Sequence, residues 1–294
     1  MRGGAEKGRT MSVDTDWLGL WRELSERAGE RRERRWAQEA NEDVWAEKAR
    51  HFLDQVARRW AKPDSSRTTV VETLTPGDTV LDIGAGAGAW TALLARHARR
   101  VTAVDPSPSM LRAMAVHLAA EGVDNVRVVE GSWQDVDVEP HDVSLCAHAM
   151  YGWHDLAGGI RKMEAATRKR CFLLMRAPLI DGVMAEASRR IHGHPHDSPS
   201  FAVAYNALWQ MGIPADVRVE DRGPWGAWSH DTLDEALADA KDRLGIPDRT
   251  EHDDFLRDLL ERRLEPRDGR LVWPPGVRSA LVSWVPRRTP DAVE

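Results

Sequence analysis

Glycine residues alternate along one short stretch of the sequence, in a pattern typical of ligand-binding turns. Gly84, Gly86 and Gly88 follow the strand-like run Val80–Ile83, and a helical run begins at Trp90. A turn without Cβ atoms lets the backbone approach a ligand closely, and a strand, a tight turn and a helix in this order open nucleotide-binding α/β units. The stretch also fits the pattern G-x-G-x-x-A, so the glycines alone leave a dinucleotide open as the ligand.

An acidic residue inside this run distinguishes the candidate ligands. Asp82 stands two positions before the first glycine. A dinucleotide places its pyrophosphate at the helix N-terminus, where a nearby carboxylate would oppose it. S-adenosylmethionine carries an ammonium and a sulfonium but no phosphate, so Asp82 favours this methyl donor. Asp105, about 20 residues past the turn, is placed to accept hydrogen bonds from the ribose hydroxyls of either ligand.

Candidate adenine contacts follow the expected strand 125–131. Trp133 is placed to lie along the adenine ring, and Ser132 or Gln134 to meet its amino edge. Ordinary core packing is the alternative for the Trp133 indole, because large aromatic side chains are mostly buried.

Candidate catalytic residues follow the next expected strand, 142–147. His148, Tyr151 and His154 would lie beside the donor, and a histidine there can accept the proton of an oxygen or nitrogen acceptor. The alternatives are a donor contact for His148 and a surface position for His154. Methyl transfer itself depends mainly on in-line positioning of the acceptor.

Strand and helix patterns alternate through the middle of the chain, which indicates a parallel sheet with helices on both faces. The expected strands there are 79–83, 100–106, 125–131, 142–147 and 171–175, with helices at 67–74, 90–96, 109–120 and 156–169. Residues 1–15 are expected to be disordered, 16–62 to form a helical extension or lid, and 63–294 to form the main domain. A loop is expected at 191–199, a helix at 201–211, and an insert at 229–277 with helices at 231–244 and 251–264 and an extended piece at 270–275.

Residues 67–177 resemble a class I S-adenosylmethionine-dependent methyltransferase, a Rossmann-like α/β family. The resemblance rests on D-x-G-x-G-x-G (Asp82 to Gly88), Asp105, the strand end near Ser132 and the segment His141–His148. It implies a seven-stranded sheet whose last strand is antiparallel, with 215–220 and 279–285 as the sixth and seventh strands. It also implies further donor contacts from Ala85, Pro106, Met110, Ala147 and His148. The chain departs from the family pattern at Ser132, where an acid is common, and in the roughly 50 residues between its last two strands.

A histidine-rich segment and two tryptophans near the insert remain open in function. His192, His194 and His196 alternate before Asp197, a set that could bind a metal, cover a substrate or lie on the surface. Gly193 and Pro195 disfavour fixed ligand geometry, so no metal is expected. Trp225 and Trp228 either line an aromatic pocket or pack in the core.

Composition and charge constrain the partners. The formal net charge is −6 and basic runs are interrupted by acidic residues, which disfavours nucleic acid. No apolar run is long enough to span a membrane, and Cys146 and Cys171 are expected to be buried, reduced thiols, so a cytoplasmic location is predicted.

The sequence therefore predicts an S-adenosylmethionine-dependent methyltransferase that acts on O, N or S of a small-molecule acceptor. The acceptor and the oligomeric state are not predicted. The alternatives are an NAD(P)-dependent oxidoreductase and a non-catalytic protein that binds the methyl donor.

Overall fold

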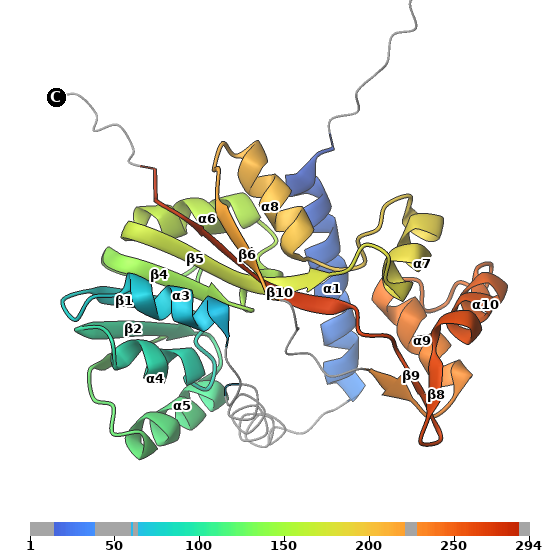
Figure 1. The fold of residues 1–294 in the computed structure, drawn as a ribbon, viewed down its shortest axis with the longest axis horizontal. Coiled ribbons are helices and arrows are strands. Elements are labelled where there is room, and N and C mark those ends of the chain that lie inside the picture. Colours follow the sequence, from blue (N-terminus) through green and yellow to red (C-terminus); the bar gives the residue numbers. More distant parts are fainter. Residues whose placement is uncertain (1–14, 39–59, 61–63, 221–227, 288–294) are drawn as a thin grey trace, which may run out of the picture.

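A computed structural model describes residues 15–38, 60, 64–220 and 228–287 (Figure 1). The expected disordered start, most of the expected 16–62 extension beyond residue 38, and Trp225 lie outside the described residues. Within the described part of the chain, no helix is both long and apolar enough to cross a bilayer.

A seven-stranded sheet forms the centre of the molecule (Figure 1). Its strand order is β3-β2-β1-β4-β5-β10-β6, and β10 runs antiparallel to both of its neighbours, β5 and β6. This confirms the expected fold class and the sixth and seventh strands. The strands are β1 (Thr79–Ile83), β2 (Arg100–Asp105), β3 (Val126–Glu130), β4 (His141–Ala147), β5 (Thr167–Pro178), β6 (Asp216–Val219) and β10 (Val277–Trp284).

Helices cover both faces of the sheet because the central strands are apolar on both sides. In β1, Leu81 packs into one core cluster and Val80 into another. The first cluster lies under α1 (Trp17–Gln38), the short helix η1 (Met150–Gly152), α6 (Leu156–Ala165) and α8 (Phe201–Gln210). The opposite face is covered by α3 (Ser65–Thr73), α4 (Ala89–Ala95) and α5 (Pro108–Ala120). Cys146 and Cys171 are buried free thiols in this core.

The insert before β10 forms a second, smaller core. It contains β7 (Ser229–His230), α9 (Leu233–Leu244), α10 (Asp253–Arg263), β8 (Glu265–Arg267) and β9 (Arg270–Val272). The three strands pair as a separate sheet, and the helices pack with α7 (Val183–His192) into one hydrophobic cluster. We call α7 together with residues 228–276 the cap.

Two sequence-based boundaries were wrong. The expected loop 191–199 begins later, because α7 continues to His192 and ends at Gly193, whose φ of 79° stops the helix. The expected helix 156–169 ends at Ala165, because Thr167 already pairs with His141 in the sheet.

Helix α1 connects the sheet domain to the cap (Figure 1). On the sheet side, Trp21 is fully buried and its indole N–H donates to the carbonyl of Trp153 at 2.7 Å. On the cap side, Arg31 forms ion pairs with Asp239 at 3.2 Å and Asp242 at 2.8 Å, both on α9. Asp239 also pairs with Arg243 at 2.7 Å. One carboxylate therefore joins α1 to α9.

Replacing Asp239 with asparagine is expected to destabilise the protein by roughly 2–4 kcal/mol, since Arg243 loses its paired carboxylate and Arg31 keeps only Asp242, at a site where the Asp239 side chain is 13% exposed. Urea unfolding measures the change. The matched control is Asp258→Asn, which removes an exposed pair with Arg262 on α10 and should cost less than about 0.5 kcal/mol. Equal losses in the two variants would contradict the connecting role of Asp239.

Candidate functional site

The carboxyl ends of the parallel strands meet at one edge of the sheet. Ile83 at the end of β1 is in register with Val104 of β2 and Cys146 of β4, and Asp105 is in register with Glu130 of β3. The residues that follow these positions therefore gather at the same edge, which is where open α/β sheets bind ligands.

The three glycines of the turn lack a side chain for different structural reasons. A Cβ on Gly84 would lie 2.1 Å from the Cβ of Ala149, and one on Gly88 would lie 2.6 Å from Cγ of Met114, so these two glycines allow close packing. Gly86 has a φ of 55°, and no atom of the described residues lies within 4 Å of its Cβ position. Its backbone thus faces open space at the sheet edge. Ala85, beside it, is half-buried, and its N–H donates to Val104 O at 3.0 Å.

Asp82 lies behind this turn, fully inside the protein. Thr91, in the first turn of α4, donates its hydroxyl to Asp82 Oδ2 at 2.6 Å. Burial, with a smaller contribution from the charge of Asp105, raises the pKa of Asp82 to about 7. The negative charge that favours a cationic donor is therefore only partly present near neutral pH until something stabilises it.

The raised pKa of Asp82 predicts a specific pH dependence of stability. The folded-state pKa of about 7 lies above the ordinary value of 3.8, so between about pH 4 and 7 the folded protein binds more protons than the unfolded chain. The contribution of Asp82 is then greatest below pH 4 and is lost as the pH rises through 7. Asp82→Asn removes this loss, and its stability relative to the parent protein should rise by roughly 1–4 kcal/mol between pH 4.5 and 8. Urea unfolding at both pH values tests this; a constant difference would contradict it.

Asp105 at the end of β2 supports the glycine turn. Its Oδ2 accepts the N–H of Gly86 at 2.8 Å and its Oδ1 accepts the N–H of Ser107 at 2.9 Å. Burial raises its pKa. Each carboxylate oxygen can accept a second hydrogen bond, so the contacts to ribose hydroxyls stay available. Beside it, Pro106 is exposed and Met110, whose N–H is capped by Ser107 Oγ at 3.3 Å, is half-buried.

Trp133 lies in the hydrophobic core, which is the packing role left open by the sequence. It is 4% exposed and donates its indole N–H to Gly159 O at 3.1 Å. One neighbour, Trp153, stacks at 6.5 Å between ring centroids, and Lys162 Nζ lies 5.0 Å from the Trp133 ring.

The polar residues around Trp133 are closer to the surface. Ser132 is half-buried and donates its hydroxyl to Asp135, and Gln134 is exposed. The sequence analysis missed Asp135, which supplies an acid three positions after Ser132. The signal for it was the acidic residue that this family often carries near this strand end.

His148 and Tyr151 form a connected pair at the end of β4. His148 Nδ1 lies 3.1 Å from Tyr151 Oη, and Tyr151 Oη accepts the backbone N–H of Arg176 at 2.6 Å. Burial raises the pKa of Tyr151 to about 12, so the phenol stays neutral. His148 has a φ of 57°, an uncommon backbone for a residue with a side chain and one that is frequent at functional sites. Ala147, just before it, is half-buried.

His154 lies apart from this pair, against α1. It is exposed, its Nδ1 is 3.2 Å from Ser25 Oγ, and its ring approaches the Cβ position of Gly29 at 3.7 Å. This arrangement fits the surface position that the sequence left open for His154 better than it fits a catalytic role.

The imidazole rings of the histidine segment stack on one another in series. His192 and His194 stack at 5.8 Å, and His194 and His196 stack at 5.9 Å. Burial lowers the pKa of all three. No group of three or more His, Cys, Asp or Glu with metal-binding geometry occurs in the part of the chain that the structure describes.

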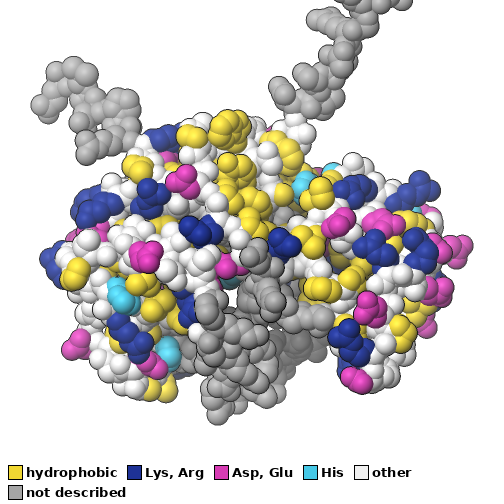
Figure 2. Space-filling model, viewed as in Figure 1, with side chains coloured by type: hydrophobic (Ala, Val, Ile, Leu, Met, Phe, Trp, Pro, Cys, Tyr) yellow, Lys and Arg dark blue, Asp and Glu magenta, His cyan; other side chains and the backbone are white. Residues whose placement is uncertain are grey.

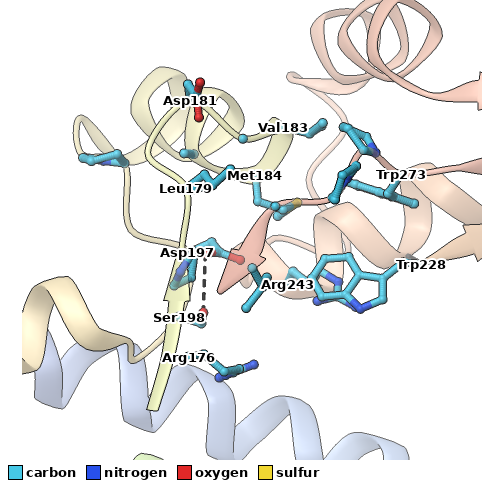
Figure 3. A pocket seen from close by; sticks show the side chains of 18 of the residues that line it. Arg176, Leu179, Asp181, Val183, Met184, Asp197, Ser198, Trp228, Arg243 and Trp273 are labelled. Atoms are coloured by element: carbon cyan, nitrogen blue, oxygen red, sulfur yellow. Dashed lines mark hydrogen bonds between the residues drawn. The ribbon is translucent and has the colours of Figure 1, made fainter. Parts of the chain in front are cut away.

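A cavity of about 590 Å³ lies between the sheet edge, α1 and the cap (Figure 3). From the sheet it is lined by Arg176 and Pro178 at the end of β5 and by Val277 and Arg278 at the start of β10. The cap contributes an apolar wall that includes Met184, Trp228 and Trp273. Because β5 is parallel to β4, this cavity shares the sheet edge of the glycine turn. The sequence analysis missed Arg176, although a charged residue directly after the apolar run 171–175 was its signal.

Comparisons with known proteins identify the class of the sheet domain. Residues 80–170 match the family described as "Methyltransferase domain". The crystal structure of a putative methyltransferase from Bacillus halodurans superimposes with a TM-score of 0.53 at 15% identity and covers 76% of this chain and 100% of that one.

Two curated relatives match shorter stretches. An uncharacterized protein of Haemophilus influenzae is 30% identical over 173 residues, which cover 57% of this chain and 62% of that protein. A probable ribosomal RNA small subunit methyltransferase A of Methanosarcina acetivorans is 38% identical over 76 residues, 26% of this chain and 28% of that protein. The matches thus span less than two thirds of these relatives.

Residues 80–170 match the methyltransferase-domain family, and the sheet has the fold of class I S-adenosylmethionine-dependent methyltransferases. This confirms the resemblance seen in the sequence.

Proposed function

We propose that this protein transfers a methyl group from S-adenosylmethionine to an O, N or S atom of a small molecule bound in the cavity between the sheet edge and the cap. The observation that carries the proposal is the chain of contacts His148–Tyr151–Arg176. It begins at the carboxyl end of β4, next to the glycine turn, and ends in the cavity.

The residues at the sheet edge fit the methyl donor. The open space at Gly86 admits a ligand against the turn backbone, and Asp105 keeps lone pairs for ribose hydroxyls. Asp82 adds a charge that a nearby ammonium would stabilise in its deprotonated form. The polar contacts assigned to the adenine are Ser132 and Gln134. Further donor contacts follow the family pattern at Ala85, Pro106, Met110, Ala147 and His148.

The donor supplies an electrophilic methyl group: the carbon–sulfur bond breaks with its electron pair remaining on sulfur, and the new bond forms to the acceptor atom. The protein's part is to align the acceptor and take its proton. His148 takes this proton on Nε2, in the tautomer whose Nδ1–H donates to Tyr151 Oη. Tyr151, held in turn by the Arg176 N–H, fixes the ring orientation and is a positioning residue.

Three observations favour a small acceptor over a nucleic acid. The cavity volume of about 590 Å³ suits a drug-sized molecule. Lys and Arg side chains are interspersed with Asp and Glu on the face drawn in Figure 2, without the continuous basic surface that nucleic acid requires. The relative named as a ribosomal RNA methyltransferase matches only 26% of this chain. Two buried free thiols fit a reducing compartment, so a cytoplasmic location belongs to the proposal.

Calorimetric titration of the protein with S-adenosylhomocysteine, and separately with NAD⁺ and NADP⁺, tests the donor. We expect micromolar binding of S-adenosylhomocysteine and none of the dinucleotides. The reverse result would replace the proposal with an oxidoreductase. S-adenosylhomocysteine binding without turnover across a broad acceptor panel would instead support a non-catalytic donor-binding protein.

A further inference from the structure

The cavity between the sheet edge and the cap has a mostly apolar body. Trp228 and Trp273 meet edge to face at 5.8 Å between ring centroids, and Leu179, Val183 and Met184 line the facing side. In Figure 3, Trp228 and Trp273 lie on one side of the cavity and Leu179 lies on the other. The side chain of Met184 points into the space between them. A flat hydrophobic ligand is the occupant that such a wall favours.

The polar part of the cavity is dominated by guanidinium groups. Six arginines line it: Arg27, Arg31, Arg176, Arg243, Arg263 and Arg278. Four of them are neutralised by protein carboxylates, namely Arg27 by Glu23, Arg31 by Asp239 and Asp242, Arg243 by Asp239, and Arg263 by Glu186. Arg176 and Arg278 make no ion pair with any carboxylate in the described ranges.

Arg176 is the cation that a ligand would reach at the reacting end of the cavity. Its side chain is half-buried, and its Nε is a buried donor without a hydrogen-bond partner among the described residues. Its guanidinium lies over the Tyr151 ring at 4.4 Å. Arg27 also lines the cavity, and its Nη1 is a second buried donor without a hydrogen-bond partner among the described residues. Buried donors are costly to leave unsatisfied, and a ligand oxyanion would satisfy them.

The charge balance favours one negative charge on the ligand. Two carboxylates also line the cavity, Asp181 and Asp197. Asp181 is exposed and lies at the far end from Arg176 (Figure 3), whereas Asp197 is half-buried and faces the centre. A dianionic phosphate monoester would meet Asp197 with excess negative charge, while a single carboxylate matches the planar guanidinium of Arg176.

We propose that the acceptor site takes a planar aromatic monocarboxylic acid, whose carboxylate binds Arg176 and whose ring lies against Trp228 and Trp273. That the bound acid is the methyl acceptor rests on the proposed function. The inference that the cavity binds an aromatic acid does not. The carboxylate anchor is next to Tyr151 and hence to His148. The methylated atom therefore lies near the carboxylate end of the ligand.

Calorimetry with three probes of one shape tests this inference: 1-naphthoate, its neutral amide 1-naphthamide, and 1-naphthyl phosphate. The protein should bind the naphthoate about 10- to 100-fold more tightly than the amide, the range of a charge-assisted hydrogen-bonded pair. Arg176→Gln should remove this preference and leave amide binding within about threefold. The control Arg168→Gln changes an exposed arginine at the other end of β5 and should retain the preference.

Four results would overturn the inference: equal binding of naphthoate and amide, a preference that survives Arg176→Gln, tighter binding of the phosphate than of the naphthoate, or no binding of either the naphthoate or the amide. Titration of the same samples with S-adenosylhomocysteine separates this from the proposed function. If the unsubstituted protein binds S-adenosylhomocysteine but does not prefer the naphthoate over the amide, the acid site alone is rejected. If it prefers the naphthoate but does not bind S-adenosylhomocysteine, the methyltransferase function alone is rejected. Thermal unfolding of each variant verifies that Arg176→Gln still folds.

Discussion

Gly86→Val is expected to abolish measurable binding of S-adenosylhomocysteine, with an affinity loss of at least about 100-fold. The valine side chain would fill the open space that faces the glycine turn, where nothing lies within 4 Å of the Cβ position. It would also strain the backbone, because φ is 55° there and β-branched residues rarely adopt it. Displacement of the turn would further disturb the hydrogen bond from Gly86 N–H to Asp105. Calorimetry measures the affinity.

A second glycine separates ligand exclusion from backbone strain. Gly122, in the turn between α5 and β3, has a φ of 66° and equally open space at its Cβ position. This turn precedes β3, so it lies at the amino edge of the sheet, opposite the glycine turn. Gly122→Val should lower the melting temperature as much as Gly86→Val does but bind S-adenosylhomocysteine normally. If both variants lose binding together, or neither does, the donor position beside Gly86 is wrong.

The residues at the carboxyl ends of the strands could be predicted because local sequence patterns mark the order of the strands and the residue at which each one ends. Each apolar run ends at a polar or glycine residue, and in a parallel sheet these ends share an edge, so Gly86, Asp105 and His148 gather without any long-range information. Asp82 shows the limit of this reasoning. Its position in the run was correct as a motif, but its burial and its bond to Thr91 follow from the packing of α4, which the pattern does not contain.

The residues that line the cavity could not be predicted, because contacts between distant segments bring them together and local sequence patterns do not show such contacts. The cap joins α7 to helices some fifty residues later, and Val183 and Met184 belong to the same hydrophobic cluster as Leu237 and Leu260, which no local periodic pattern indicates. Arg176 illustrates this: its side chain lines a cavity only because the cap lies over the end of β5.

The sequence left open where the rings of Trp133 and His154 lie. An indole after a strand end can face a ligand or the core, and both positions look alike in sequence. For Trp133 the contacts are with Trp153, which follows β4, and with Gly159 in α6. His154 is decided by Ser25 of α1 in the same way. Contacts between distant segments thus determined both outcomes.

His148→Asn is expected to lower kcat by about 10²- to 10⁴-fold, which is the usual contribution of a general base. Asparagine is the appropriate substitution because it tolerates the left-handed backbone that His148 adopts at a φ of 57°. The amide cannot accept the acceptor's proton, so the limb of the pH–rate profile that reports deprotonation of the base should disappear as well. Steady-state kinetics across pH measures both effects.

Two further variants distinguish proton transfer from positioning. Tyr151→Phe keeps the imidazole but removes the oxygen that lies 3.1 Å from its Nδ1, so kcat should fall by a smaller factor, about 5- to 20-fold, with the pH limb retained. His154→Asn makes the same substitution at the exposed histidine against α1 and should leave kcat within about threefold. A His148→Asn protein that keeps more than a third of its turnover would show that alignment of the acceptor suffices. The acceptor atom would then be one that carries no proton at its reacting position, such as a carboxylate oxygen held at Arg176.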